Sequence, residues 1–203
     1  AIKLSSNETP LGTSKKALEA IQKASSNPAR YPDGSALELR KSLAKFNNLK
    51  INNILCGNGS DEILSMFANC FAGPGDEVIY SEHGFLVYPI AIKAAGAKPI
   101  TSKEINYKAD VEAIIKVSSN KTKICFIANP NNPTGTYLTR NELIHLREKL
   151  PKECLLVIDS AYAEYVNEED YTNGIDLVTL YNNIACTRTF SKIYGLAALR
   201  IGW

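Results

Sequence analysis

Short apolar runs alternate with amphipathic helical segments along most of this chain, and this alternation limits the possible folds more than any other feature. The apolar runs predict strands at 77–81, 98–102, 122–128, 154–158 and 184–187. Helical spacing of apolar residues predicts helices between them at 85–95, 111–117 and 140–150. Because helices that join successive strands form crossover units, we expect an α/β fold with a mostly parallel sheet sandwiched by helices.

The first third of the chain carries mainly helical signals. Apolar residues recur at helical spacing over 13–25, 35–46 and 63–71, and a short extended segment at 53–56 precedes the last of these. A loop rich in helix breakers, residues 27–34, separates the first two predicted helices.

The composition excludes several classes of protein. The 203 residues are 45% hydrophobic, which suffices for a substantial core, and the net charge of +2 comes without a basic run that would bind nucleic acid or an anionic membrane. No stretch approaches the roughly 18 apolar residues of a membrane span. We therefore expect small-molecule partners, no nucleic acid and no membrane.

The cysteines argue against both disulfides and zinc. Five of them are scattered without Cys-x-x-Cys spacing: Cys56, Cys70, Cys125, Cys154 and Cys186. We interpret them as buried thiols in a reducing, cytoplasmic compartment. Because only two histidines could add imidazole ligands, we expect no metal site.

Three distinctive segments each follow a predicted strand directly. They are residues 129–135, 159–162 and 188–192. Ligands of parallel α/β sheets bind in the crevice outside the carboxyl ends of the strands. The sequence therefore predicts that the three segments converge on one cleft.

Lys192 is the candidate nucleophile. It lies in Thr-Phe-Ser-Lys-Ile-Tyr-Gly, among apolar neighbours, with Arg200 eight residues further on. A lysine in a partly dry site loses ammonium hydration, which favours the free amine that forms a Schiff base with an aldehyde cofactor. The hydroxyls of Thr189 and Ser191 and the cation of Arg200 could then hold a phosphate. The alternative is a surface lysine on a turn, with Arg200 in an exposed ion pair.

Asp159 ends an apolar run, where an ionised carboxylate needs a partner. A pyridinium nitrogen would supply one, but so would a turn or an arginine. Asn132 and Tyr162 could donate hydrogen bonds to a phenolate oxygen of the same ligand, or serve only turn geometry and packing.

Residues 57–62, Gly-Asn-Gly-Ser-Asp-Glu, precede a predicted helix whose first N–H groups favour a phosphate. The alternative is that Ser60 or Asp61 only caps this helix. The segment is not a dinucleotide motif, because Glu62 replaces the third glycine, and it lacks a P-loop lysine. Phe85 or Tyr88 could stack on a flat ring or belong to the core.

Taken in this order, the motifs resemble the fold-type-I pyridoxal-phosphate enzymes, most closely the histidinol-phosphate aminotransferases, over essentially all 203 residues. The resemblance implies pyridoxal 5'-phosphate as cofactor and Lys192 as the catalytic residue, which forms the Schiff base and moves the proton at the substrate carbon. It places the remaining cofactor-binding residues at the ring nitrogen (Asp159), the ring face (Phe85), the phenolate oxygen (Asn132, Tyr162) and the phosphate (Ser60, Asp61, Thr189, Ser191, Arg200).

The same resemblance assigns two residues of the N-terminal part. Tyr31 matches a tyrosine that reaches the phosphate of the neighbouring subunit's cofactor, which implies a homodimer with shared active sites. Residues 6–12 resemble a segment that covers the substrate, with Asn7 as a substrate-binding residue. Thr9 and Leu11 depart from the family's usual asparagine and frequent tyrosine there.

The resemblance also divides the chain. Residues 1–34 correspond to an N-terminal segment and inter-subunit loop, and residues 35–203 to a cofactor-binding large domain that is incomplete at its C-terminal end. The sequence begins without an initiator methionine and ends inside an apolar segment. We therefore expect an inactive fragment that lacks the family's small domain and the arginine that binds the substrate carboxylate.

The expected activity is transfer of an amino group between glutamate/2-oxoglutarate and a phosphorylated or aromatic amino compound, with L-histidinol phosphate of histidine biosynthesis favoured. One alternative is a pyridoxal-phosphate-dependent decarboxylase or lyase, such as a threonine-phosphate decarboxylase. The other is a non-catalytic, aminotransferase-like sensor domain. The near-neutral charge and the lack of a preceding basic helix argue against the sensor.

Overall fold

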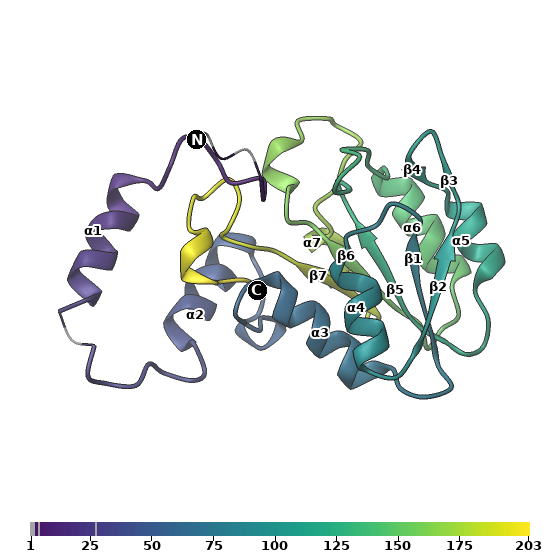
Figure 1. The fold of residues 1–203 in the computed structure, drawn as a ribbon, viewed down its shortest axis with the longest axis horizontal. Coiled ribbons are helices and arrows are strands. Elements are labelled where there is room, and N and C mark those ends of the chain that lie inside the picture. Colours follow the sequence, from purple (N-terminus) through teal and green to yellow (C-terminus); the bar gives the residue numbers. More distant parts are fainter. Residues whose placement is uncertain (1–2, 4, 27) are drawn as a thin grey trace.

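A five-stranded parallel sheet forms the centre of the computed structural model, which describes residues 3, 5–26 and 28–203 (Figure 1). In spatial order its strands are β2 (Lys98–Ser102), β1 (Glu77–Ser81), β5 (Thr122–Ala128), β6 (Leu155–Asp159) and β7 (Ile184–Thr187). All neighbouring strands pair in parallel. The predicted α/β class is confirmed, and β6 alone is displaced, by one residue, from its predicted bounds.

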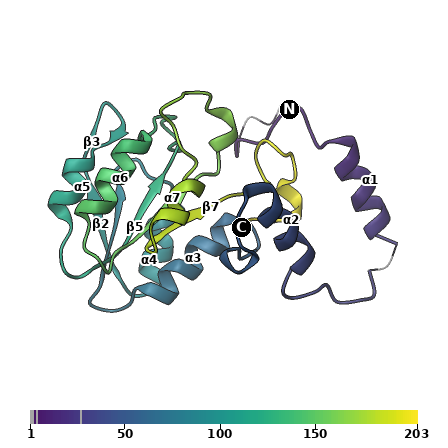
Figure 2. The same ribbon diagram turned by 180° about the vertical axis from the view of Figure 1, so that it is seen from behind.

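Helices cover both faces of this sheet, as Figures 1 and 2 show from opposite sides. The helices are α1 (Lys15–Ala24), α2 (Leu37–Asn47), α3 (Ser60–Phe71), α4 (Val87–Ala94), α5 (Val111–Val117), α6 (Arg140–Lys149) and α7 (Ile175–Leu180). Successive strand residues point to opposite faces, so Phe126 packs with α3 and α4 while Ile127 packs with α5, α6 and α7. Burial on both faces explains why the strands are continuous apolar runs.

The elements that the sequence pattern did not predict are all short. A two-stranded antiparallel hairpin joins β3 (Glu104–Ile105) to β4 (Lys108–Ala109), and three 3₁₀ turns occupy Ile51–Asn53, Ala163–Tyr165 and Ala197–Leu199. The sequence pattern does not predict α7 either, because six residues are too few to show a helical period. The expected extended segment at 53–56 is wrong at Asn53, which belongs to a 3₁₀ turn, whereas Ile54 is extended.

The interpretation of the cysteines is only partly correct. All five are free thiols, but only Cys125 and Cys154 are buried, Cys56 and Cys186 are half-buried, and Cys70 is exposed. Cys70 follows the buried Ala68 by two residues, which places it about 200° around α3 on the solvent side. The described residues contain no cluster of three or more potential metal ligands.

The N-terminal arm, described at residues 5–26 and 28–34, differs from the sheet region in its burial. Ser14 caps α1 by accepting a hydrogen bond from the Ala17 N–H, and yet α1 buries none of its residues. Figure 1 shows α1 standing apart from the sheet. No helix in the described part of the chain is both long and apolar enough to cross a membrane.

The last residues of the chain bring three distant segments together. Gly202 bridges antiparallel to Gly57 on one side and to Thr189 on the other. A side chain at Gly202 would clash with the backbone of Gly59 and Ser60. This close approach positions the start of α3 and Arg200 beside the segment that follows β7.

Candidate active site

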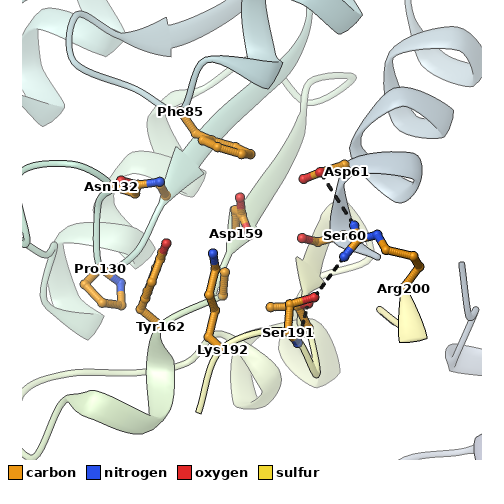
Figure 3. A pocket seen from close by; sticks show the side chains of 13 residues that line it. Ser60, Asp61, Phe85, Pro130, Asn132, Asp159, Tyr162, Ser191, Lys192 and Arg200 are labelled. Carbon is orange, nitrogen blue, oxygen red and sulfur yellow. Dashed lines mark hydrogen bonds and ion pairs between the residues drawn. The ribbon is translucent and has the colours of Figure 1, made fainter. Parts of the chain in front are cut away.

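The segments that follow β5, β6 and β7 do converge, at the carboxyl ends of the strands, on one cavity of about 110 Å³ (Figure 3). Its lining consists of Ser60, Asp61, Phe85, Ala128, Pro130, Asn132, Asp159, Ala161, Tyr162, Thr189, Ser191, Lys192 and Arg200. This lining includes every predicted cofactor-binding residue except Tyr31. A strand-end rule applied to the sequence therefore locates the cavity correctly.

Lys192 lies on the loop after β7 and points into the cavity (Figure 3). Its Nζ donates a hydrogen bond to the Ser6 carbonyl at 2.9 Å and lies 5.4 Å from the centre of the Tyr162 ring. The ammonium is thus held by a carbonyl oxygen and an aromatic face, with no carboxylate among these contacts. This arrangement leaves a lysine nitrogen available to a ligand in the cavity.

Asp159 lies on the cavity wall and is only 4% exposed. Its Oδ1 accepts a hydrogen bond from Thr187 Oγ1 and its Oδ2 from Tyr88 Oη, both at 2.9 Å. Burial raises the pKa of Asp159, whereas these hydroxyls and the Ala161 N–H oppose the rise. Among the described residues its partners are these neutral donors and no arginine, so a cationic group in the cavity would relieve the cost of burying the carboxylate.

The two aromatic candidates have different positions. Phe85 is half-buried and presents its ring to the cavity (Figure 3). Tyr88 belongs to the core, 1% exposed and stacked on Phe126 with ring centres 5.1 Å apart and planes 4° apart. Phe85 is therefore the aromatic side chain that can cover a flat ligand. The Tyr88 ring packs edge to face with the Phe85 ring, with ring centres 5.9 Å apart.

The N-terminal end of α3 forms one end of the cavity. Its N-cap is Gly59, and no described side chain caps the helix. The alternative that Ser60 or Asp61 only caps α3 is therefore wrong, because both are helical residues of its first turn. The first N–H groups of α3 are available to an anion, which the helix dipole also favours.

Arg200 adds a cation to this end, and Ser191 and Thr189 add two hydroxyl groups. Its Nη1 donates to Ser191 Oγ at 3.2 Å, and its Nη2 lies 3.8 Å from Asp61 Oδ2 (Figure 3). The Ser191 N–H in turn donates to Thr189 Oγ1 at 3.1 Å. The combination of a guanidinium, hydroxyls and a helix N-terminus suits a phosphate group.

Hydrogen bonds fix the loop that carries Asn132. Asn129 accepts from the Leu138 N–H at 2.7 Å and donates to the Leu138 carbonyl at 3.1 Å. Tyr171 Oη donates to the Asn129 carbonyl at 2.8 Å, and the Asn131 N–H donates to the Thr136 carbonyl at 2.8 Å. The loop thereby presents the Asn132 amide to the cavity on a rigid support.

Comparison with known proteins agrees with this geometry. The sequence profile of aminotransferases of class I and II matches residues 1–203. The chain belongs to this family.

The sequence is 50% identical, over 202 residues, to the histidinol-phosphate aminotransferases of Paramagnetospirillum magneticum and Erythrobacter litoralis. Each match covers 100% of the chain but 56% and 55% of those proteins, so the chain spans about half their length. The crystal structure of histidinol-phosphate aminotransferase from Sinorhizobium meliloti in complex with pyridoxal-5'-phosphate gives a TM-score of 0.91 at 28% identity, covering 97% of this chain and 54% of that one.

Two of the predicted site residues, Asn7 and Tyr31, lie outside the cavity lining. Asn7 Nδ2 donates to Tyr162 Oη at 3.0 Å, at the margin of the cavity, and Thr13 Oγ1 donates to the Gly195 carbonyl at 2.6 Å. The N-terminal segment thus reaches two loops of the site. Tyr31 is fully exposed and lines no part of the cavity, so its role toward a neighbouring subunit stays a prediction.

Neither hydroxyl partner of Asp159, Thr187 or Tyr88, is among the site contacts predicted from the sequence. Thr187 pairs with Asp159 in the parallel register of β6 and β7, and the predicted strand ends could have revealed that contact. Tyr88 was considered only as a ring-stacking or core residue. No sequence signal connects Tyr88 to Asp159, because the contact depends on how α4 packs against the sheet.

Proposed function

We propose that the complete natural protein containing this sequence is a pyridoxal-phosphate-dependent aminotransferase that exchanges an amino group between L-histidinol phosphate and 2-oxoglutarate in histidine biosynthesis. The observation that carries the proposal is that Lys192, Asp159 and the anion-binding end at Arg200 all line one cavity. The names of the two relatives with 50% identity support the choice of substrate.

The residues fit the cofactor group by group. The N-terminus of α3, with Arg200 and Ser191, suits its phosphate. Asp159, a buried carboxylate with only neutral partners, suits a protonated ring nitrogen. Phe85 can cover one face of the ring, and the hydrogen-bond donors of Asn132 and Tyr162 suit its phenolate oxygen.

Bound pyridoxal phosphate would supply an aldehyde for the lysine amine and a conjugated ring that accepts electrons from the substrate carbon. Lys192 would bind that aldehyde and later hold and return the proton of the substrate carbon. Asp159 would hold the proton of the ring nitrogen through its negative charge. Asn132 and Tyr162 would orient the ring, and Phe85 would exclude water from one face.

We further infer a cytoplasmic homodimer with shared sites, in which Tyr31 contacts the cofactor of the partner subunit. The full exposure of Tyr31 and the absence of buried residues in α1 support a role for residues 1–34 outside their own subunit. The division into this segment and a large domain at 35–203 rests on the same argument.

The test uses the complete natural protein with added pyridoxal phosphate. We expect a yellow imine absorbance that Lys192→Ala abolishes, together with a loss of turnover of at least about 100-fold, whereas Lys103→Ala, an exposed lysine outside the cavity, retains both. An unchanged absorbance in Lys192→Ala would refute the assignment of that lysine.

Product analysis decides the reaction. Formation of glutamate from 2-oxoglutarate with L-histidinol phosphate as donor is the expected result. The decarboxylase alternative is assayed with a substrate that carries a carboxylate, threonine phosphate, and release of carbon dioxide from it without formation of a keto acid would establish that alternative instead. Cofactor binding without turnover of any amino compound would favour the sensor alternative.

A further inference from the structure

Tyr88 has a contact that its position in the core does not require. Its hydroxyl donates to Asp159 Oδ2 at 2.9 Å, although packing alone would accept a phenylalanine there. Burial and the neighbouring Asp159 charge raise the pKa of Tyr88 well above its ordinary value, so the phenol keeps its proton and remains a donor. A hydrogen bond from a buried hydroxyl to a buried carboxylate stabilises the charged form of that carboxylate.

Aromatic packing fixes the direction of this donor. The Tyr88 ring stacks on Phe126. It is T-shaped to the rings of Tyr80 and Phe85, with ring centres 6.5 Å and 5.9 Å apart. With 1% exposure, the ring has no space to rotate its hydroxyl toward water. The donor therefore stays aimed at Asp159 whether or not the cavity holds a ligand.

The geometry divides the Asp159 carboxylate between core and cavity. Tyr88 and Thr187 donate to its two oxygens, yet neither residue lines the cavity, whereas Asp159 does. Both hydroxyls thus approach from the protein side and leave the cavity side of the carboxylate for a ligand. Donors to a carboxylate stabilise its charged form and make it a weaker base.

We propose that Tyr88 is a positioning residue that keeps Asp159 anionic. When a cofactor is bound, Asp159 and the ring nitrogen of the cofactor compete for one proton, and the Tyr88 hydrogen bond favours its staying on the ring nitrogen. The inference rests on the proposed function. Without the phenol, Asp159 becomes a stronger base and draws this proton toward itself. The ring would then accept electrons less well, although Lys192 and the phosphate-binding end are untouched.

The experiment measures the ¹⁵N chemical shift of ¹⁵N-labelled pyridoxal phosphate bound to the complete protein. In Tyr88→Phe we expect the shift to move from the protonated toward the neutral pyridine value. We also expect affinity for the cofactor to fall about tenfold, the usual effect of losing a hydrogen bond to a charged group. Tyr181→Phe is the matched control, because it removes a phenol that donates to the Glu148 carboxylate away from the cavity.

A double-mutant cycle separates this role from packing. In an Asp159→Asn background, Tyr88→Phe should leave affinity for the cofactor nearly unchanged, because no carboxylate charge remains to stabilise. An equal loss in both backgrounds, or a wild-type ¹⁵N shift in Tyr88→Phe, overturns the proposal. If Tyr88→Phe does not fold, 4-aminophenylalanine at position 88 keeps the ring and supplies a weaker N–H donor, so it should also move the shift toward the neutral value, and an unmoved shift overturns the proposal. A wild-type protein that binds no pyridoxal phosphate would refute the proposed function instead.

Discussion

The two sides of the cavity are built in different ways. On the sheet side, Asp159 sits at a strand end among buried partners, and its hydrogen bonds come from β7 and α4. On the other side, the N-terminal arm meets the site through single contacts such as Asn7 to Tyr162 and Thr13 to Gly195, and α1 buries no residue. The chain thus fixes the buried groups of the cavity internally, whereas Asn7 at the cavity margin depends on a lightly held segment.

The largest effect should come from the buried side, in Asp159→Asn. We expect turnover to fall by about 10²-fold or more, because a neutral amide does not stabilise a cationic ring. The cofactor-free protein should nevertheless melt at a higher temperature at neutral pH, since the amide avoids the cost of burying a charge. Measuring kcat and thermal unfolding on the same samples tests both statements.

The difference in stability between wild type and Asp159→Asn should depend on pH, because the pKa of Asp159 is raised in the folded protein. Between the ordinary aspartate pKa and the raised folded-state pKa, the native protein binds more protons than the unfolded chain, so wild-type stability falls as pH rises through that window. Asp159→Asn lacks this loss, and its advantage should vanish below the ordinary aspartate pKa of about 3.9. An advantage that persists in acid would show that the amide stabilises by another route.

A smaller effect is expected at the junction where Gly202 packs against the start of α3. Gly202→Ala places a methyl group against the backbone of Gly59 and Ser60, which cannot move as a flexible side chain would. We expect a loss of about 1–3 kcal/mol in the free energy of unfolding, measured with denaturant, and weaker binding of pyridoxal phosphate. Gly73→Ala is the control, because a methyl group there meets nothing within 4 Å. Equal unfolding midpoints for the two variants would contradict this account of the junction.

The smallest effect should come from the arm, in Thr13→Val. This change removes the hydrogen bond to the Gly195 carbonyl, worth about 1 kcal/mol, and loosens the segment that carries Asn7. We expect KM for the amino substrate to rise about fivefold while affinity for the cofactor stays near wild type. If affinity for the cofactor falls as well, the two sides of the cavity are more strongly coupled than the contacts indicate.

The parts of the fold that the sequence predicted well are those with a strong local signal. The strands at Glu77–Ser81 and Thr122–Ala128 have their predicted bounds, because runs buried on both faces differ sharply from their polar flanks. The hairpin at 104–109 was missed because strands of two residues carry no period, and its turn uses left-handed Asn106 and Tyr107 in place of glycine.

The candidate site could be predicted only as far as strand ends reveal it. The rule that ligands bind at the carboxyl ends of parallel strands located Asp159 and Lys192 on one cavity. It could not find Tyr88, whose hydroxyl reaches Asp159 only through tertiary packing of α4. Nor could it decide that Gly59 ends the loop before α3, since Ser60 and Asp61 are equally good capping residues by type.

The pairing of Gly202 with both Gly57 and Thr189 has a consequence for synthesis of the protein on the ribosome. Strands β1 to β7 all precede residue 188, so a nascent chain can assemble the sheet before Arg200 has left the exit tunnel. The end of the cavity at Arg200, in contrast, needs segments about 140 residues apart to meet, and such long-range contacts form late. Competence to hold a ligand should therefore appear only after the five strands of the parallel sheet have been synthesised and have packed.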